Sequence, residues 1–335
     1  MRGVVAAAVV VLGVTGAQAN PVADFYTGKN VNVLIGYSAG GGYDLYARLL
    51  SRHMGKHIPG RPGMVAQNMP GAGSLKVATF LYSVAPKDGT AIGTFGRGMP
   101  IYPLLFTPEF DGTKFGYLGS ITKDTSVCIT WHTSPIKNWN DLMTKPSAFG
   151  GEGKGADPDM FATLIRDGFK AKLKLVSGYP GTADMTLAME RGELDGLCGI
   201  SMSTIIAAHS AWLTQKKINV VLQIATEKHR AIPDTPLITD LATSPSQKMV
   251  LDVAVAPQTM ARPFVSPPDI PAARLKALQE AFDRTMKDPD FLSDAERMKL
   301  DINPVTGAEI AEIVKKLYAA PKEVLQQASA YMGAK

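Results

Sequence analysis

Nine residues near the N-terminus have the composition of an anion-binding turn. Segment 36–44 reads GYSAGGGYD and follows an apolar run, 31–36, that predicts a buried strand. Glycines let backbone N–H groups approach a ligand closely, and the helix expected from Asp44 adds the positive end of its dipole. The segment therefore predicts a site for a carboxylate or phosphate, with Asp44 as the helix N-cap.

The same segment contains the G-x-S-x-G pattern of a serine hydrolase, with Ser38 in the nucleophile position. That site would need an oxyanion loop before the serine, and an acid and then a histidine after it. Here the pattern follows the first expected strand of the mature chain, and no histidine comes after His229. A secreted serine esterase therefore stays an alternative only, and we expect no catalytic residue.

Two more glycine-containing turns lead from an expected strand into an expected helix. Segment 150–155 reads GGEGKG, which lacks the spacing of a nucleotide-binding P-loop but suits a second anion site with Lys154 adding charge. Segment 179–184 reads YPGTAD, where Thr182 could contact a ligand or cap the helix. Arg97, which follows another expected strand, is a candidate fork for a carboxylate.

Strand-like and helical segments alternate along the chain, which predicts an α/β fold with mostly parallel sheets flanked by helices. Without residues 1–19 the 335-residue chain keeps 316 residues, more than one hydrophobic core usually organises. We therefore expect two lobes with a cleft between them. The expected division places 20–124 and 252–335 in lobe 1 and 125–251 in lobe 2.

The first 19 residues have the form of a signal peptide. Arg2 precedes an apolar run, 4–16, and Ala17-Gln18-Ala19 has the small-x-small pattern that signal peptidase cleaves. No later run of about 18 apolar residues could span a bilayer. The sequence thus predicts export to the periplasm with cleavage after Ala19.

Charge, cysteine and histidine content exclude several classes of protein. The formal net charge of +5, or +4 without Arg2, is spread without basic runs, so we expect no nucleic-acid partner. Cys128 and Cys198 lie in strand-like segments of an exported chain, which leaves a disulfide and two buried free thiols as open alternatives. The five histidines lack metal-ligand spacing, so we expect neither metal nor cofactor.

Five short motifs, in order along the chain, resemble those of the extracytoplasmic receptors of tripartite tricarboxylate transporters. They are N-M-P-G-A-G-S at 68–74, V-A at 77–78, A-P-K-D-G-T at 85–90, G-E-L-D at 192–195 and I-P-D-T-P at 232–236. The similarity extends from about Val31 to the C-terminal helices. An ordered series of this kind is more specific than any of its single motifs.

The resemblance implies a type II-like periplasmic binding protein whose two lobes, joined by crossing strands, close on a small organic acid. It implies delivery to a permease with a large and a small membrane subunit, while a sensor for a membrane kinase stays an alternative. We expect a monomer. The sequence leaves open whether the acid is aromatic or carries two or three carboxylates.

The resemblance also assigns ligand contacts to three loops. These are Tyr37, Ser38, Ala39, Gly40 and Gly41 with Asp44; Gly151, Gly153 and Gly155; and the turn from Tyr179 through Gly181 and Thr182 to Ala183. Lys154 and Arg97 are added from their charge alone. Segment 37–41 reads YSAGG where the family usually has F-P-P-G-G, so Ser38 gains a hydroxyl that proline lacks.

Overall fold

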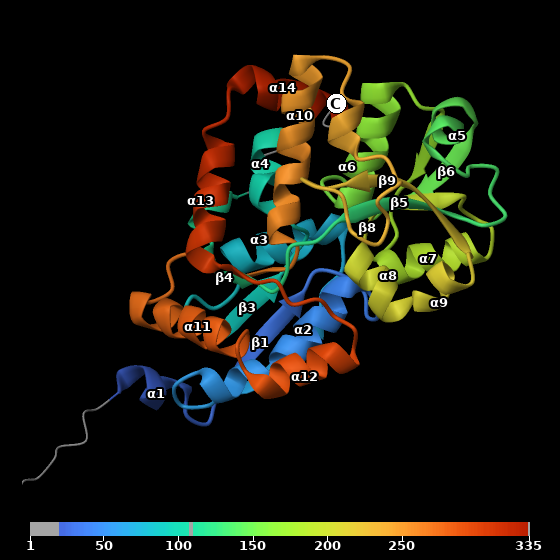
Figure 1. Ribbon diagram of the computed structural model, residues 1–335. Coiled ribbons are helices and arrows are strands. Elements are labelled where there is room, and N and C mark those ends of the chain that lie inside the picture. The colour runs from blue at the N-terminus through green and yellow to red at the C-terminus, as the bar shows by residue number, and fades with distance from the viewer. Residues whose placement is uncertain (1–19, 107–109, 334–335) are drawn as a thin grey trace, which may run out of the picture.

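The computed structural model describes residues 20–106 and 110–333, and it contains two sheets flanked by helices (Figure 1). The predicted signal peptide and its cleavage site lie outside the described residues. The first sheet contains β1 (Asn30–Ile35), β2 (Gly63–Asn68), β3 (Ala91–Thr94), β4 (Gly116–Ser120), β10 (Pro263–Ser266) and β11 (Val305–Thr306). The second contains β5 (Ser126–Trp131), β6 (Ser147–Gly150), β7 (Leu173–Val176), β8 (Gly196–Ser201) and β9 (Ile218–Ile224).

The strand order is β11-β4-β10-β3-β1-β2 in the first sheet and β7-β6-β8-β5-β9 in the second. Pairing is parallel between β1 and its neighbours β2 and β3, and between β6 and its neighbours β7 and β8. By contrast, β4, β5, β9 and β10 pair antiparallel with their neighbours. The two-lobed α/β fold is thus confirmed. The sheets are mixed rather than mostly parallel, because the strands next to the lobe crossings pair antiparallel with their neighbours.

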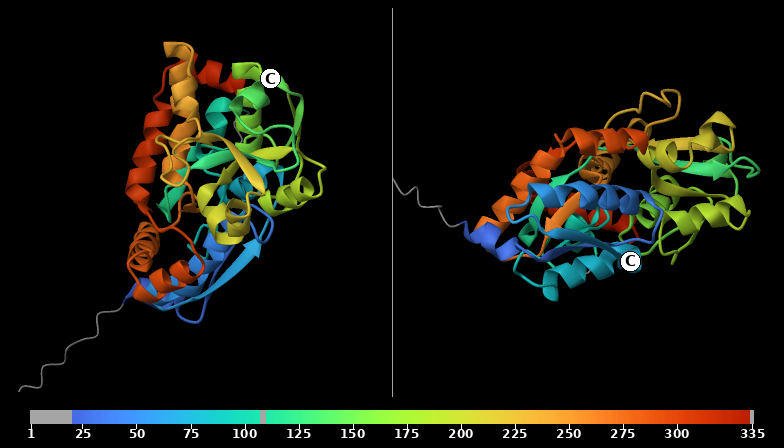
Figure 2. Two further views of the ribbon diagram at one scale, coloured as in Figure 1. Left: turned by 45° about the vertical axis from the view of Figure 1, so that its right-hand side comes forward. Right: turned by 90° about the horizontal axis from the view of Figure 1, so that it is seen from below.

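Helices cover both faces of each sheet (Figure 2). Against the first sheet and its ends lie α1 (Pro21–Tyr26), α2 (Gly42–His53), α3 (Leu75–Ser83), α4 (Tyr102–Leu105), α11 (Ala272–Thr285), α12 (Pro289–Arg297) and α13 (Gly307–Tyr318). The others are α5 (Trp139–Thr144), α6 (Asp157–Thr163), α7 (Thr182–Glu190), α8 (Met202–Ala208), α9 (Ser210–Thr214), α10 (Pro245–Val255) and α14 (Lys322–Tyr331). Within the described residues, no helix has both the length and the apolar character needed to cross a bilayer.

The apolar run of β1 is explained by burial on both faces of the first sheet. Val33 and Ile35 belong to one core cluster with α2 and α11, whereas Leu34 belongs to a cluster on the opposite face with α3. A strand covered on both faces reads as a continuous apolar run rather than an alternating one. This packing fixes the end of β1, and therefore the start of the turn that follows it.

The chain passes between the sheets twice. It leaves the first sheet after β4, crosses at 121–125 into β5, and returns after α10 through 256–262 into β10. The C-terminal helix α14 packs on α10, and its Ala328 shares a core cluster with Phe149 of the second sheet. The exact division into lobes at 124 and 251 stays a prediction.

Two local expectations have different outcomes. Thr306 and Glu309 form the expected capping box at the start of α13. Asp44, by contrast, is not an N-cap: α2 begins at Gly42 with Gly41 as its cap, so Asp44 is the third helical residue. Its carboxylate instead accepts hydrogen bonds from the backbone of Gly40 and the side chains of Arg48 and Asn68.

An acidic residue of α12 ties that helix to α2 and should make the fold sensitive to acid. Asp294 lies 2.9 Å from Arg52 and 3.0 Å from His53, and these hydrogen bonds, with His53 contributing most, lower the pKa of Asp294 to about 2. A carboxylate with a lowered pKa stabilises the fold above its unfolded pKa, and that contribution is lost as pH falls through the folded value.

We therefore expect Asp294→Asn to cost roughly 1 kcal/mol of unfolding free energy at neutral pH, with the difference from wild type shrinking as pH falls from about 4 towards 2. Urea denaturation at several pH values measures this. Asp234→Asn is the matched control, because Asp234 is exposed and has no ion pair among the described residues. Equal losses for both variants, or a pH-independent loss, would contradict the assignment.

Candidate ligand-binding site between the two lobes

The starts of two helices from different lobes face each other. Gly40 and Gly41 lead into α2, and Thr182 and Ala183 begin α7. A Cβ atom built on Gly41 would lie 3.9 Å from Cβ of Thr182, and one on Gly40 would lie 4.0 Å from Cβ of Ala183. The first N–H groups of a helix have no partner within it, and each N-terminus carries a partial positive charge. Two such ends brought together favour an anion between them.

Ser38 joins the first turn to the third. Its hydroxyl donates to Oδ2 of Asp184 at 2.7 Å, and its N–H donates to the carbonyl of Pro180 at 3.4 Å. The structure thus brings together two of the three predicted loops and gives the serine a specific contact. No histidine of the described residues is hydrogen-bonded to Ser38, so the arrangement lacks the base that an esterase nucleophile needs.

The second predicted loop uses its N–H groups internally. The N–H of Glu152 and that of Gly153 both donate to Oδ2 of Asp159, at 2.6 and 2.9 Å, while Gly151 donates to the carbonyl of Val176. The N–H groups of Gly151 and Gly153, two of the expected ligand donors in this loop, are therefore already bound to the chain. Asp159, from the helix that follows, acts as an internal anion for it.

Close packing between the lobes explains why positions 153 and 155 are glycine. Gly153 has φ +143°, and a Cβ there would lie 2.8 Å from the N atom of Gly73 in the other lobe. Gly155 has φ +87°, and a Cβ there would press on Tyr102 and Met99. Both glycines permit close packing at the lobe contact. The family-like motif at 68–74 supplies the small residues on the opposite side of that contact.

Glu152 is the buried acid of this loop, with only 6% of its surface exposed. Its Oε1 accepts a hydrogen bond from the hydroxyl of Thr182 at 3.2 Å. Burial and, to a lesser degree, the neighbouring Asp159 charge raise the pKa of Glu152 to about 8. The Glu152 charge contributes in turn, after burial, to raising the pKa of Tyr37 well above its ordinary value.

Arg97 is buried at the lobe contact, with 1% of its surface exposed. Its Nε lies 2.9 Å from Oδ2 of Asp157, Nη1 donates to Gln258 at 2.6 Å, and Nη2 donates to Ser201 at 2.8 Å. Asp157 and Ser201 belong to the second sheet and its helices, and Gln258 lies on the returning crossing. Arg97 therefore links all three parts of the protein.

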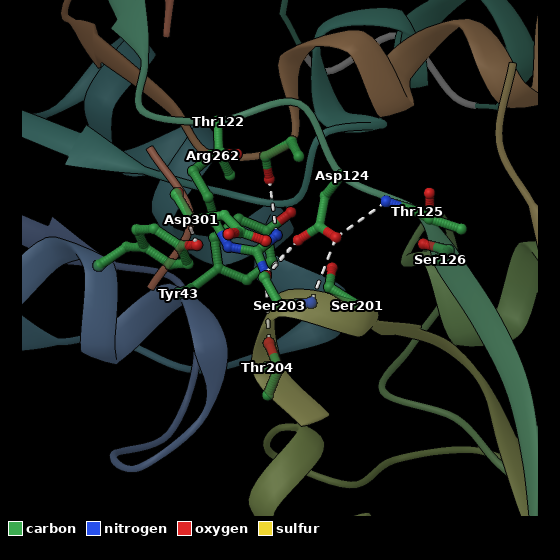
Figure 3. A network of polar contacts seen from close by, with 12 residues as sticks. Tyr43, Thr122, Asp124, Thr125, Ser126, Ser201, Ser203, Thr204, Arg262 and Asp301 are labelled. Atoms are coloured by element: carbon green, nitrogen blue, oxygen red, sulfur yellow. Dashed lines mark hydrogen bonds and ion pairs between the residues drawn. The ribbon is translucent and has the colours of Figure 1, made fainter. Parts of the chain in front are cut away.

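A second buried arginine occupies the crossing itself (Figure 3). Nη2 of Arg262 lies 3.4 Å from Oδ2 of Asp124 and 3.3 Å from the hydroxyl of Thr204, and Asp124 also accepts from Ser203. The guanidinium covers one face of the Tyr43 ring at 4.8 Å. These contacts hold the two crossing segments and the start of α8 together.

The predicted aromatic residues differ in their surroundings. Tyr37 stacks on Tyr43 at 4.6 Å between ring centroids, so Tyr43 has one face on Tyr37 and the other on Arg262. Tyr179 is half-buried, and its N–H donates to the carbonyl of Gly151, which connects the second and third loops. Lys154 is exposed, with its Nζ 5.5 Å from the Phe106 ring centroid. Ala39 is exposed on the first turn.

Several polar residues at the lobe contact were not selected from the sequence, notably Glu152, Asp157, Asp159, Ser201 and Gln258. The Asp157-Pro158 pair predicts a helix that is capped by Asp157, but Ala156 is the cap and Asp157 is the first residue of α6. Glu152 lies inside the GGEGKG segment, and an acidic residue among glycines is the sequence feature that could have marked it as a candidate. The partners of Asp157, Ser201 and Gln258 lie far away in the sequence, and no local pattern marks these residues.

Two curated proteins are similar to the chain over most of its length, whereas no protein-family model matches it. One is the UPF0065 protein in the gbd 5′ region of Cupriavidus necator, 22% identical over 97% of this chain and 95% of the relative. The other is the UPF0065 protein in the TAR-I ttuE-ttuC′ intergenic region of Agrobacterium vitis, 27% identical over 79% and 74%. Over most of its length the chain is thus similar in sequence to the UPF0065 proteins. The relation to the receptors of tripartite tricarboxylate transporters, predicted from the motifs, is thereby confirmed.

Solved structures with the same fold as this chain include two periplasmic proteins. The periplasmic binding protein BugD has a TM-score of 0.74 at 18% identity and covers 91% of this chain and 99% of its own. MatC from Rhodopseudomonas palustris with bound malate has a TM-score of 0.70 at 18% identity and covers 89% and 99%. The chain therefore has the fold of a periplasmic binding protein.

Proposed function

We propose that this chain is a solute-binding protein that captures a small organic carboxylate between its lobes. The observation that supports this most directly is the opposition of the α2 and α7 N-termini, which offers N–H donors from both lobes to one anion. Glycine donors lose no side-chain entropy when they bind. Structural neighbours were solved with malate and with adipate, which agrees with a carboxylate ligand.

The protein acts outside the cytoplasm and is not a catalyst in this proposal. The signal peptide is removed after Ala19, the monomer binds its acid in the periplasm, and it then delivers the acid to the large and small membrane subunits. Ser38 contributes a contact across the cleft rather than a nucleophile, because its hydroxyl is committed to Asp184. The predicted contacts of the first and third loops form the site, while the second loop supports it.

Gly181 provides a direct test of binding between the lobes. Its φ of 178° suits any residue, but a Cβ there would lie 2.5 Å from Oγ of Ser38, so Gly181→Ala should prevent the turns from meeting without straining its own lobe. A thermal-shift screen of organic acids identifies the ligand of the wild type. We expect Gly181→Ala to bind that acid at least about tenfold more weakly, a loss of about 1.4 kcal/mol.

Gly168→Ala is the control, since a Cβ there would make only an ordinary contact of 3.5 Å with Leu164. Both variants should keep the melting temperature of ligand-free wild type within a few degrees. Failure of every carboxylate to shift the wild-type protein would contradict the proposed function. So would unchanged affinity in Gly181→Ala.

A further inference from the structure

Each of the helices α2, α6 and α7, which follow the three predicted turns, has an aspartate as its third residue. These are Asp44, Asp159 and Asp184. Two of them fold back onto the turn before their own helix: Asp44 accepts the N–H of Gly40 at 3.0 Å, and Asp159 accepts two N–H groups of segment 150–155 at 2.6 and 2.9 Å. In both cases the donors belong to the same lobe as the aspartate.

Asp184 is the exception, because its own turn lacks the corresponding donor. Gly40 lies two residues before the start of α2, whereas the residue two before the start of α7 is Pro180, which has no N–H. Oδ2 of Asp184 instead accepts the hydroxyl of Ser38 at 2.7 Å, from the other lobe. No second hydrogen bond to this carboxylate is found among the described residues. The donor that Asp184 lacks locally is thus supplied by the opposite lobe.

Ser38 contacts the third turn through its backbone as well. Its N–H donates to the carbonyl of Pro180 at 3.4 Å, and a Cβ on Gly181 would lie 2.5 Å from its Oγ and 3.2 Å from its N atom. The position of the hydroxyl is therefore set by the backbones of both turns. A proline at position 38, as in the F-P-P-G-G pattern of the receptors that the sequence resembles, would lack both the hydroxyl and the N–H that make these two hydrogen bonds.

The hydrogen bond between Ser38 and Asp184 should favour the closed arrangement of the lobes. A hydrogen bond to a charged group is stronger than one between neutral groups, but both side chains are only half-buried, so water replaces the contact when the lobes separate. The net gain on closure is therefore expected to change the ratio of closed to open protein by about tenfold, or about 1.4 kcal/mol. Because both partners belong to the protein, this gain does not depend on a ligand.

We propose that Ser38 and Asp184 form a latch, which shifts the equilibrium between open and closed lobes towards the closed state before a ligand binds. The effect on affinity rests on the proposed function: if the acid binds between closed lobes, its apparent affinity rises with the closed fraction of the ligand-free protein. Ser38 and Asp184 are then positioning residues, which act on affinity through the lobes and not through contact with the acid.

Distances between the lobes of the ligand-free protein test the latch. Spin labels on Lys76→Cys of α3 and Leu187→Cys of α7, both exposed positions, report the closed fraction by double electron–electron resonance. We expect Ser38→Ala and Asp184→Ala each to lower the ratio of closed to open protein about tenfold. The double variant should lower it no further, because both changes remove the same contact. By titration calorimetry, the acid that the thermal-shift screen identifies should bind Ser38→Ala up to about tenfold more weakly.

Ser83→Ala is the matched control, because Ser83 is exposed and its hydroxyl has no hydrogen bond among the described residues. Melting temperatures compared with wild type show whether the variants fold. The inference is overturned if Ser38→Ala leaves the ligand-free distances unchanged, in which case a loss of affinity reports direct contact with the acid. It is also overturned if the two single effects add in the double variant. Distances that respond as expected, with no acid bound by wild type, support the latch and contradict only the proposed function.

Discussion

Replacing Arg97 with methionine is expected to weaken ligand binding on the order of a hundredfold, even if the guanidinium never touches the ligand. Arg97 pairs with Asp157 across the lobe contact and also binds Gln258 and Ser201. Removing one partner of a buried ion pair leaves the other charge unpaired, which costs about 3 to 5 kcal/mol. Opening of the lobes hydrates Asp157 and removes that cost. Part of the free energy of ligand binding is then used to close the lobes, so the observed affinity falls.

The effect should depend on pH in a defined direction. Burial raises the pKa of Asp157, while Arg97 acts in the opposite direction, so the raised pKa should rise further in Arg97→Met. A carboxyl group whose pKa is higher in the closed state than in the open state favours closure at a pH below its open-state pKa. This contribution to closure is lost as the pH rises through its closed-state pKa. Titration calorimetry should therefore show a smaller loss of affinity at about pH 5 than at about pH 8.

A double variant distinguishes this explanation from direct ligand contact. Arg97→Met combined with Asp157→Asn removes the unpaired charge, so most of the lost affinity should return. If Arg97 instead binds the ligand carboxylate, as its charge alone predicted, the double variant should stay as weak as the single one. Arg191→Met serves as the surface control, since Arg191 is exposed and has no ion pair among the described residues.

The turns of the proposed site could be predicted because their signals are local. An apolar run that ends in glycines predicts a strand followed by a tight turn, and β1 with its turn into α2 confirms this. The same reasoning located the strands before the 150–155 and 179–184 turns. Helix boundaries were less well predicted. Asp44 and Asp157 have the residue type of a cap, but Asp44 binds Arg48 and Asn68 instead, and Asp157 pairs with Arg97.

Which N–H groups remain for a ligand could not be predicted from the sequence. Glycine content alone makes 150–155 look like an anion site, but Asp159 folds back to accept two of its N–H groups. Charge alone likewise makes Arg97 look like a ligand contact, although Gln258 and Ser201 lie more than a hundred residues away. Such assignments depend on long-range packing, which no spacing in the chain encodes.

The cysteines offer the second large effect, because the structure decides between the two alternatives that the sequence left open. Cys128 of β5 and Cys198 of β8 form a disulfide between paired strands, at a sequence separation of 70. Both belong to a buried core cluster of the second sheet. Joining residues this far apart restricts the unfolded chain, so replacing both with alanine should lower the free energy of unfolding by about 4 kcal/mol.

Guanidinium denaturation of wild type, reduced wild type and Cys128→Ala/Cys198→Ala measures this loss. A reducing agent should lower the stability of wild type and leave the double variant unchanged, and an unfolding midpoint indifferent to reduction would contradict the disulfide.

The location of the disulfide gives a more specific prediction than the magnitude of its contribution to stability. Because β5 and β8 are central strands of the second sheet, the loss should appear as faster amide hydrogen exchange in that sheet, while β1 and β3 of the first sheet keep their protection. The α7 N-terminus is positioned by the second sheet, so ligand affinity should fall along with this protection. A uniform rise in exchange over both sheets would instead mean that the lobes unfold as one unit. The disulfide would then stabilise the site only by raising the global stability of the protein.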